Sequence, residues 1–309
     1  MISVIIPTYK RSSRLPIAIE SVLGQTYSPL EIIVVDDNDD NEYRKETKSV
    51  LKKYISQNKI TYIQHKSNQG GCVARNTGAF AAKGEYIAFL DDDDFYEPTK
   101  LEEQINFLNN NPQLDACMCS MFRIDENNKQ IESRENTARG ETLKEAILDG
   151  NLFTSMLLIK KNIFLKLEGF SEIPRFQDKY FHYKFLNLGY KIGVLNKQLL
   201  TLVEHSGLRI SYLGAKKIIK SLDLLAEFEK SNKEKFTNQE IKFLKYRRYI
   251  KISEVLCEGR FNEKIKSLIY IVKAFIYAST KHYQYIGLLT LKSLTPNAII
   301  KLKTKRDDS

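Results

Sequence analysis

Four consecutive carboxylates, Asp91 to Asp94, follow the short apolar run from Tyr86 to Leu90. Like charges this close raise one another's pKa values unless a cation or hydrogen-bond donors compensate for them. A divalent-cation site is therefore one interpretation of the cluster. A solvated acidic turn, or the acidic first turn of a helix, would explain it equally well without a ligand. A calcium loop of the EF-hand type is disfavoured, because Tyr96 stands at the sixth position, where that loop needs glycine.

Two further polar groups follow apolar runs in the same manner. Pro7-Thr-Tyr9 comes after Ser3–Ile6, and Asp36-Asp37 comes after Glu31–Val35. Such runs predict buried strands, and apolar residues at helical spacing predict the helices between them. The expected strands are residues 3–6, 31–35, 60–64 and 86–90, and the expected helices are about 13–24, 43–56 and 72–82.

This alternation of strands and helices indicates an α/β fold with a mostly parallel sheet covered on both faces. Loops that follow parallel strands meet at the carboxyl edge of the sheet, where ligands gather. We therefore expect the three polar groups to form one site. No glycine-rich phosphate loop follows the first strand, which disfavours dinucleotide binding and P-loop chemistry. A nucleotide phosphate would instead need a bound cation, and Mg²⁺ binds one or two carboxylates together with phosphate oxygens.

At this point residues 1–210 resemble the family-2 glycosyltransferases, inverting enzymes of the GT-A fold. The resemblance rests on four motifs in the expected order: Ser3–Arg11, Glu31–Asp37, an N-x-G-x-x-x-A-R-N-x-G pattern at Asn68–Gly78, and a D-x-D element at Asp91–Asp93. It implies a GT-A (nucleotide-diphospho-sugar transferase) fold, a UDP-sugar donor and Mg²⁺ or Mn²⁺ as the cofactor.

The resemblance also implies roles for single residues. Pro7, Thr8 and Tyr9 would hold the nucleobase, and Asp36 would accept the imide N–H of uracil. Arg75 would reach the base or the diphosphate, and Asp91 would face the ribose. Asp93 would be the main metal ligand, and Asp92 would make an auxiliary contact. Asp94 would cap or charge the following helix. The alternatives are an ordinary acidic turn at Asp36 and a surface arginine at Arg75.

An inverting transferase needs a carboxylate that deprotonates the acceptor hydroxyl. The stretch Gly169–Tyr180 resembles the family's segment that ends in an acidic pair, whose second acid is the base. The pair here is Gln177-Asp178, which makes Asp178 the expected base and leaves the role of Gln177 open. Asp178 could instead only cap the helix expected at about 179–188. Asp115, Glu168 and Glu172 are rival acids that do not match the motif.

His205 stands where many members of that family carry a histidine after a late strand. The resemblance implies that His205 completes the metal shell or touches the diphosphate, and a purely structural histidine is the alternative. Arg209 is a weaker candidate for neutralising phosphate.

Charge is distributed unevenly over the 309 residues. Residues 1–209 carry a net charge of −1, whereas residues 210–309 carry +11. This predicts a GT-A catalytic domain at 1–209 and a basic helical region at 210–309, whose apolar stripes at helical spacing favour packing or self-association. The same region suits an anionic membrane surface.

Four cysteines fit neither a zinc pattern nor a disulfide framework, which favours a reducing, cytoplasmic location. The first residues lack the pattern of a signal peptide, and no apolar run is long enough for a transmembrane helix. We therefore expect a cytoplasmic protein with peripheral contact on the inner face of the cell membrane.

The expected function is transfer of a hexose from a UDP-sugar to a glycan acceptor, most simply a lipid-linked oligosaccharide in capsular or other surface polysaccharide synthesis. A sugar-nucleotide nucleotidyltransferase is the alternative enzyme, although Pro7-Thr-Tyr-Lys-Arg11 lacks the glycines that it would need. A basic nucleic-acid-binding protein is the alternative from another class. It is suggested by charge alone, and we expect no nucleic-acid partner.

Overall fold

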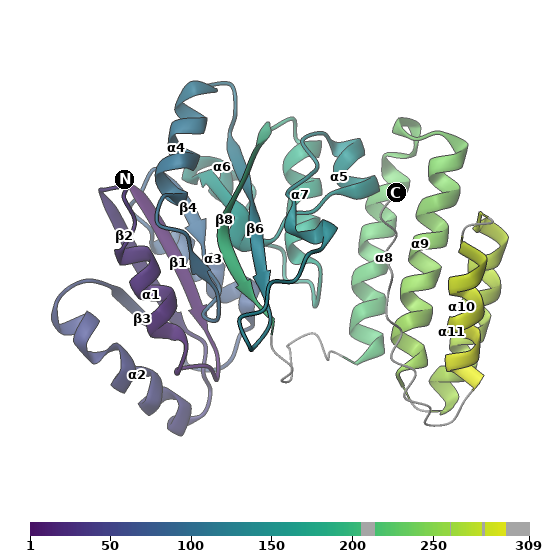
Figure 1. Ribbon diagram of the computed structural model, residues 1–309, viewed down its shortest axis with the longest axis horizontal. Helices are drawn as coiled ribbons and strands as arrows, with labels where there is room; N and C mark the ends of the chain where they lie inside the picture. The colour runs from purple at the N-terminus through teal and green to yellow at the C-terminus, as the bar shows by residue number, and fades with distance from the viewer. Residues whose placement is uncertain (205–213, 260, 280–281, 295–309) are drawn as a thin grey trace. The chain divides into compact units, whose positions relative to one another are not determined.

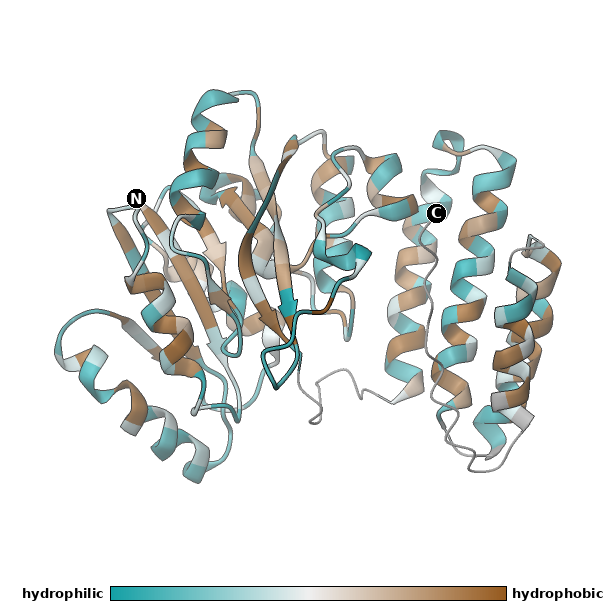
Figure 2. Cartoon of the chain, in the orientation of Figure 1, coloured by the Kyte–Doolittle hydropathy of each residue, from teal (hydrophilic) through white to brown (hydrophobic). Residues whose placement is uncertain are grey.

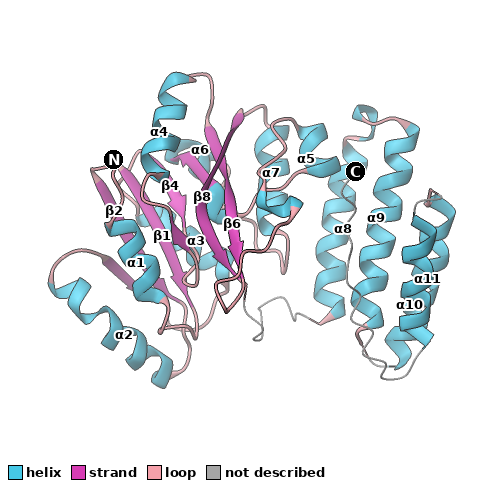
Figure 3. Ribbon diagram, viewed as in Figure 1, coloured by secondary structure: helices cyan, strands magenta, loops and turns pink. Residues whose placement is uncertain are grey.

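The computed structural model describes residues 1–204, 214–259, 261–279 and 282–294. The chain divides into two compact units, Met1–Arg209 and Ile210–Ser309. Strands and helices alternate in the first unit, and the described part of the second unit is helical (Figure 3).

The elements of the first unit follow the alternation that the apolar runs predicted. The strands are β1 Ile2–Thr8, β2 Leu30–Asp36, β3 Thr61–Gln64, β4 Tyr86–Phe89, β5 Phe95–Tyr96, β6 Ala116–Ile124, β7 Leu157–Lys160 and β8 Ile192–Val203. The helices are α1 Leu15–Leu23, α2 Asn41–Ser56, α3 Gly71–Ala81, α4 Lys100–Asn110, α5 Leu143–Asp149, α6 Lys161–Lys166 and α7 Gln177–Asn187, with short 3-10 turns at Arg134–Asn136 and Thr154–Met156.

The strands form one sheet in the order β3-β2-β1-β4-β7-β6-β8-β5 (Figure 1). The first four strands of this order are parallel, with Thr8 of β1 opposite Asp36 of β2 and Ile5 opposite Phe89 of β4. The carboxyl ends of these strands therefore lie along one edge. The predicted mostly parallel sheet is confirmed here, and its helices pack on both faces.

The second half of the sheet is mixed. Strand β7 is antiparallel to both β4 and β6, β8 is parallel to β6, and β5 is antiparallel to β8. The β5–β8 pairing places Phe95 opposite Thr201. The long strand β8 therefore ends beside the acidic turn between β4 and β5.

The core explains why the strands are continuous apolar runs. The side chains of Val4, Ile5 and Ile6 are all completely buried, as expected for parallel strands that are covered on both faces. Helix α3 packs closely on β1 and β2 because it has glycine at residue 78. A Cβ atom there would lie 2.4 Å from Cγ2 of Ile5.

The second unit contains α8 Ala215–Ser231, α9 Asn238–Cys257, α10 Phe261–Tyr277 and α11 Tyr283–Leu294, with a 3-10 turn at Lys233–Lys235. It has its own core, to which α9, α10 and α11 contribute Ile250, Ile271 and Leu289, respectively. No helix in the described ranges is both long and apolar enough to span a bilayer.

Candidate active site

The polar groups predicted to converge do lie together at the carboxyl edge of the parallel strands. Thr8 ends β1, Asp36 ends β2, and the acidic turn Asp91–Asp94 follows β4. The Thr8 hydroxyl donates a buried hydrogen bond of 2.8 Å to Oδ2 of Asp92. One side chain thus ties the end of β1 to the acidic turn.

The four carboxylates of the acidic turn face different partners. In order from Asp91 to Asp94, these are the Arg75 guanidinium, the Thr8 hydroxyl, the Arg11 guanidinium and the backbone N–H of Val203. Two arginines therefore pair directly with Asp91 and Asp93. Arg11 lies 82 positions before Asp93, and sequence reasoning did not identify it as a site residue.

Burial of the acidic turn disfavours the charged forms of its carboxyl groups. It raises the pKa of Asp92 to about 7, with the neighbouring Asp93 charge acting in the same direction. The pKa of Asp94 is also raised, first by burial and then by Asp93. The arginine partners therefore do not fully compensate for the four acids.

The prediction that Asp94 caps or charges the next helix is wrong. Helix α4 begins at Lys100, and Asp94 is 4% exposed, with Oδ1 accepting the Val203 N–H at 3.1 Å. Asp94 turns inward because the β5–β8 pairing brings the end of β8 to the turn.

Asp36, the expected uracil ligand, is completely buried at the end of β2. Its Oδ1 accepts hydrogen bonds from the backbone N–H of Asn38 at 3.0 Å and from the Asn38 amide at 2.7 Å. Its Oδ2 accepts from the Tyr62 hydroxyl at 2.6 Å. Both oxygens are thus oriented by the protein, and burial raises the pKa of Tyr62, so that its hydroxyl stays a donor.

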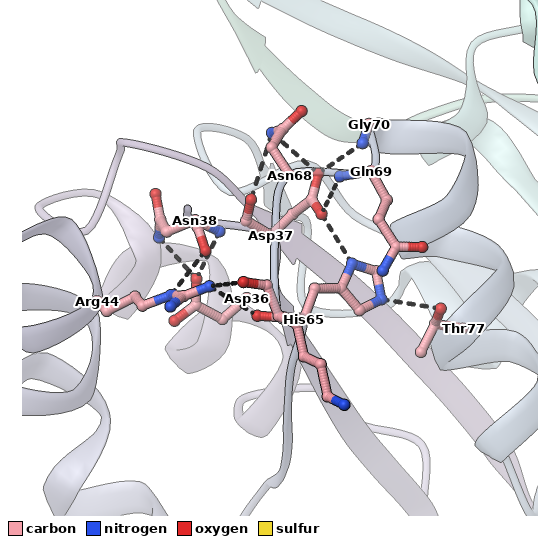
Figure 4. Close-up of polar contacts among 10 residues, drawn as sticks. Asp36, Asp37, Asn38, Arg44, His65, Asn68, Gln69, Gly70 and Thr77 are labelled. Carbon is pink, nitrogen blue, oxygen red and sulfur yellow. Dashed lines mark hydrogen bonds and ion pairs between the residues drawn. The ribbon is translucent and has the colours of Figure 1, made fainter. Parts of the chain in front are cut away.

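Asp37, which sequence analysis placed in the same polar group as Asp36 without a role of its own, is buried and has several hydrogen-bond partners (Figure 4). Its carboxylate accepts from the backbone N–H groups of Gln69 and Gly70, both at 2.8 Å, and contacts Nδ1 of His65 at 2.7 Å. Asn68 adds a bond of 3.2 Å. The end of the Glu31–Asp37 motif thereby holds the start of the Asn68–Gly78 motif in place. Asn68 of the N-x-G sequence was the residue from which this contact could have been predicted.

Tyr9 and Pro7 are half-buried at the end of β1. Nζ of Lys10 lies 5.0 Å from the Tyr9 ring centroid. The backbone of Lys10 has φ of 57°, and its N–H donates to the Asn38 side chain at 2.7 Å. The loop after β1 is therefore fastened to the loop after β2 by the bond from Lys10 to Asn38.

Arg75 of α3 is 7% exposed, which excludes the alternative of an ordinary surface arginine. Burial alone would lower its pKa, but the paired Asp91 carboxylate holds the pKa above its usual value. Its buried Nε has no hydrogen-bond partner in the described part of the chain. Gly71 leaves room for the guanidinium, since a Cβ atom there would lie 3.0 Å from Nη1 of Arg75. A buried arginine with spare donor capacity is suited to an anionic ligand.

Asp178 lies in the first turn of α7 and is half-buried. Burial raises the pKa of its carboxyl, whereas the Arg75 charge acts in the opposite direction, which places the two groups within electrostatic reach. Phe176 is the N-cap residue of α7, and Asp178 lies in the first turn, where its charge also favours the start of the helix. Its two possible roles, as the base and as a charge at the start of the helix, both stay predictions. Its Oδ1 accepts a hydrogen bond of 2.7 Å from the backbone N–H of the adjacent Lys179.

Two sets of contacts that were not predicted connect Phe170, which precedes Asp178 in the chain, to α3, β4 and α7. The Asn76 amide donates to the Phe170 carbonyl and accepts from the Phe170 N–H, both at 2.8 Å. The Phe170 ring lies 5.1 Å from Phe89, which ends β4, and 4.8 Å from Phe181 of α7. The aromatic contacts link the strand before the acids to the helix that carries Asp178.

The last two expected residues, His205 and Arg209, follow β8 in the sequence and fall outside the described residues. Glu204, the last described residue before them, forms an ion pair with Arg123.

No group of three or more histidine, cysteine or acidic side chains within the described ranges is arranged to hold a metal ion. A magnesium ion bound to substrate phosphates needs only one or two protein carboxylates. Asp91 and Asp93 meet that smaller requirement as oxygen donors in one turn. Asp93 also forms an ion pair with Arg11.

Comparison with known proteins bears on both the family and the fold. The family model described as Glycosyl transferase family 2 matches residues 3–171. A glycosyltransferase of Haemophilus influenzae is 34% identical over 188 residues, which are 58% of this chain and 60% of that protein. One of Rickettsia prowazekii is 28% identical over 305 residues, covering 91% and 92% of the two chains.

Among solved structures, Staphylococcus aureus TarS 1-349 in complex with UDP-GlcNAc matches with a TM-score of 0.68 and 19% identity. The match covers 94% of this chain and 88% of the TarS chain. The fold is therefore that of a GT-A glycosyltransferase followed by helices.

Proposed function

The chain belongs to glycosyl transferase family 2, and from this premise we propose that it transfers a sugar from a UDP-sugar to a hydroxyl of a glycan acceptor with inversion. The observation that carries the proposal is the meeting of three groups at one edge of the sheet. These are the acidic turn, the buried Arg75 and the ionisable Asp178. The likeness to TarS, whose structure contains UDP-GlcNAc, supports the UDP-sugar donor.

We propose that Thr8, Tyr9 and Asp36 form the nucleobase end of the site. Asp36 is buried with both oxygens fixed by hydrogen bonds from Asn38 and Tyr62. A carboxylate oxygen can accept a further bond, so a uracil imide N–H would find an oriented acceptor there. The preorganised carboxylate would favour uracil over a base without an N–H at that position.

The diphosphate would lie between the two arginines and the acidic turn. Asp93 would be the main ligand of Mg²⁺ or Mn²⁺, which when bound supplies Lewis-acid stabilisation of the leaving diphosphate, and Asp91 would face the ribose. Arg11 and Arg75 form ion pairs with Asp93 and Asp91. We propose that their guanidinium groups also bind phosphate oxygens of the donor.

Asp178 would act as the general base. Its carboxylate would take the proton from the acceptor hydroxyl while that oxygen attacks the anomeric carbon opposite the leaving UDP. The C–O bond to UDP breaks as the new C–O bond forms, which inverts the anomeric configuration. The raised pKa of Asp178 brings its basicity closer to what proton transfer at neutral pH needs.

For the whole protein we propose residues 1–209 as the catalytic unit and a lipid-linked or other surface glycan as the acceptor. This would place the enzyme on the cytoplasmic side of the membrane in polysaccharide synthesis. The acceptor proposal rests on the family resemblance.

A donor screen tests the proposed function. The full chain is incubated with Mn²⁺ and single nucleotide-sugars, and release of the nucleoside diphosphate is followed with and without simple glycan acceptors. We expect release from at least one UDP-sugar and none from the matched GDP-sugar. Release from no nucleotide-sugar, or equal release from both bases, would sink the proposal. Nucleotidyltransferase activity would instead consume a sugar phosphate and UTP.

A further inference from the structure

Helix α10 has apolar side chains on two opposite faces. Its inner face places Ile271 and Ala274 in the core of the helical unit, with 5% and 0% exposure. Its outer face carries a second apolar row. A helix that is apolar all round is normally covered on all sides, so the outer row calls for a partner.

The outer row is regular and extensive. Ile265, Ile269, Val272 and Ile276 follow one another at intervals of four, three and four residues, which places them on one face, and they are 47%, 53%, 63% and 69% exposed. We call these four residues the α10 stripe. Phe275 borders it and stacks on Tyr283 of α11, with ring centroids 5.1 Å apart.

This region concentrates the exposed apolar surface of the described chain. Eight of the fifteen large apolar side chains that are markedly exposed belong to α10 and α11. Figure 2 shows the brown colour of apolar residues along both helices. A contiguous patch of this kind marks an interaction surface.

Charge decides which partner fits. Lys266 and Lys273 are exposed, follow Ile265 and Val272 in sequence, and therefore line one side of the stripe. The segment 210–309 carries a net charge of +11. A second copy of the same surface would set like charges against one another, whereas an anionic phospholipid surface attracts the lysines and accepts the apolar side chains.

We propose that the α10 stripe docks the protein on an anionic phospholipid surface, with the helix lying in the plane of the interface. The stripe enters the boundary between headgroups and acyl chains, and Lys266 and Lys273 contact the lipid phosphates. This inference concerns the second unit and does not depend on the proposed transferase activity.

The test is sedimentation of the full-length protein with vesicles of phosphatidylcholine alone or mixed with phosphatidylglycerol. We expect binding to the mixed vesicles only, falling as salt is raised. The double substitution Ile269→Ser and Val272→Ser should lower the partition coefficient by about tenfold or more, since each change removes an apolar side chain that would be buried in the bilayer. Lys266→Gln with Lys273→Gln should weaken it by about thirtyfold.

The matched control is Ile17→Ser with Leu188→Ser, which removes side chains that are 56% and 61% exposed on the first unit. This control should bind vesicles like the unmodified protein, and all variants should keep the same circular dichroism spectrum. Absence of binding by the unmodified protein, or equal loss in control and stripe variants, would overturn the proposal. So would a dimer in solution that the stripe variant converts to monomer, because the stripe would then be covered by a second copy.

Discussion

Asp36 and Asp37 are adjacent, yet their carboxylates are held by different parts of the chain. Asp36 contacts Asn38 and Tyr62, whereas Asp37 accepts two backbone N–H groups from the start of the third motif. A strand alternates its side chains between two faces, so neighbours at a strand end meet different surroundings. We infer that Asp36 serves a ligand and Asp37 serves the loop.

Asp37→Ala should therefore lower stability more than any exposed acid nearby. The substitution removes the buried carboxylate that accepts from the N–H groups of Gln69 and Gly70, and a hydrogen bond to a charged group contributes about 1.5–3 kcal/mol. We expect the free energy of unfolding in urea to fall by about 3 kcal/mol. The exposed Asp39→Ala should change it by less than about 0.5 kcal/mol. Equal losses in the free energy of unfolding from the two substitutions would show that the hydrogen bonds of Asp37 do not stabilise the fold.

Asp178 supplies a pH-dependent prediction. The base must be ionised to accept a proton, and burial raises the pKa of this carboxyl above its usual 3.8. Activity should therefore fall as pH decreases through the raised pKa. Asp178→Asn should reduce kcat by about 10²–10⁴-fold with UDP affinity unchanged. The measurement is kcat/KM against pH, with Glu172→Gln as the control, and a fully active Asp178→Asn variant would move the base elsewhere.

The sequence predicted residue types at this edge better than their partners. The acids, Arg75 and Asp178 could be predicted as candidates because motifs and strand ends are local signals, and their roles stay predictions. Arg11 and Asn76 were missed because their partners lie 82 and 94 positions away. Asp94 was assigned to the following helix because its contact with Val203, 109 positions away, is not visible locally.

At the scale of elements, the site depends on how the Asp178 segment is attached to the sheet. Asn76 of α3 satisfies both the N–H and the carbonyl of Phe170, and the Phe170 ring packs between Phe89 and Phe181. An amide is needed here, because only a side chain with both a donor and an acceptor can make this pair of bonds. Helix α7 is thus positioned by α3 and β4.

Asn76→Asp should lower kcat without lowering UDP affinity. The carboxylate cannot donate to the Phe170 carbonyl, so the segment that leads to Asp178 shifts while the nucleotide end of the site stays in place. A misplacement of this kind costs about 10²-fold in rate. Asn109→Ala, an exposed substitution on α4, is the control. A parallel loss of kcat and UDP affinity in Asn76→Asp would contradict this role.

The elements themselves were largely predictable. Strands β1 to β4 and helices α1 to α3 follow apolar runs and helical spacing closely. The mixed half of the sheet was not predicted, because antiparallel pairing of β7 and β5 depends on partners far along the chain. The helical character of the second unit was predicted and is confirmed over its described residues, although the sequence analysis gave no separate bounds for α8 to α11.

At the scale of the whole molecule, the two units differ in charge and in surface. Residues 1–209 carry a net charge of −1 and contain the candidate active site, while residues 210–309 carry +11 and the α10 stripe. This contrast suggests that the first unit performs the chemistry and the second unit sets its location.

A fragment of residues 1–209 should therefore bind UDP within about twofold of the full chain, because the first unit has its own extensive core. The same fragment should no longer sediment with anionic vesicles. Titration calorimetry and vesicle sedimentation measure the two properties separately. Loss of UDP binding in a folded fragment would mean that the second unit contributes to the donor site.

We propose above all that the edge containing Asp91 and Asp93 binds a nucleoside diphosphate through a divalent cation. Titration of UDP into the full chain by calorimetry, with Mn²⁺ and then with EDTA, tests it most directly. We predict binding with Mn²⁺ that weakens about tenfold or more in EDTA and in Asp93→Ala, but not in Asp39→Ala. A UDP affinity that is the same with Mn²⁺, with EDTA and in Asp93→Ala would contradict this proposal.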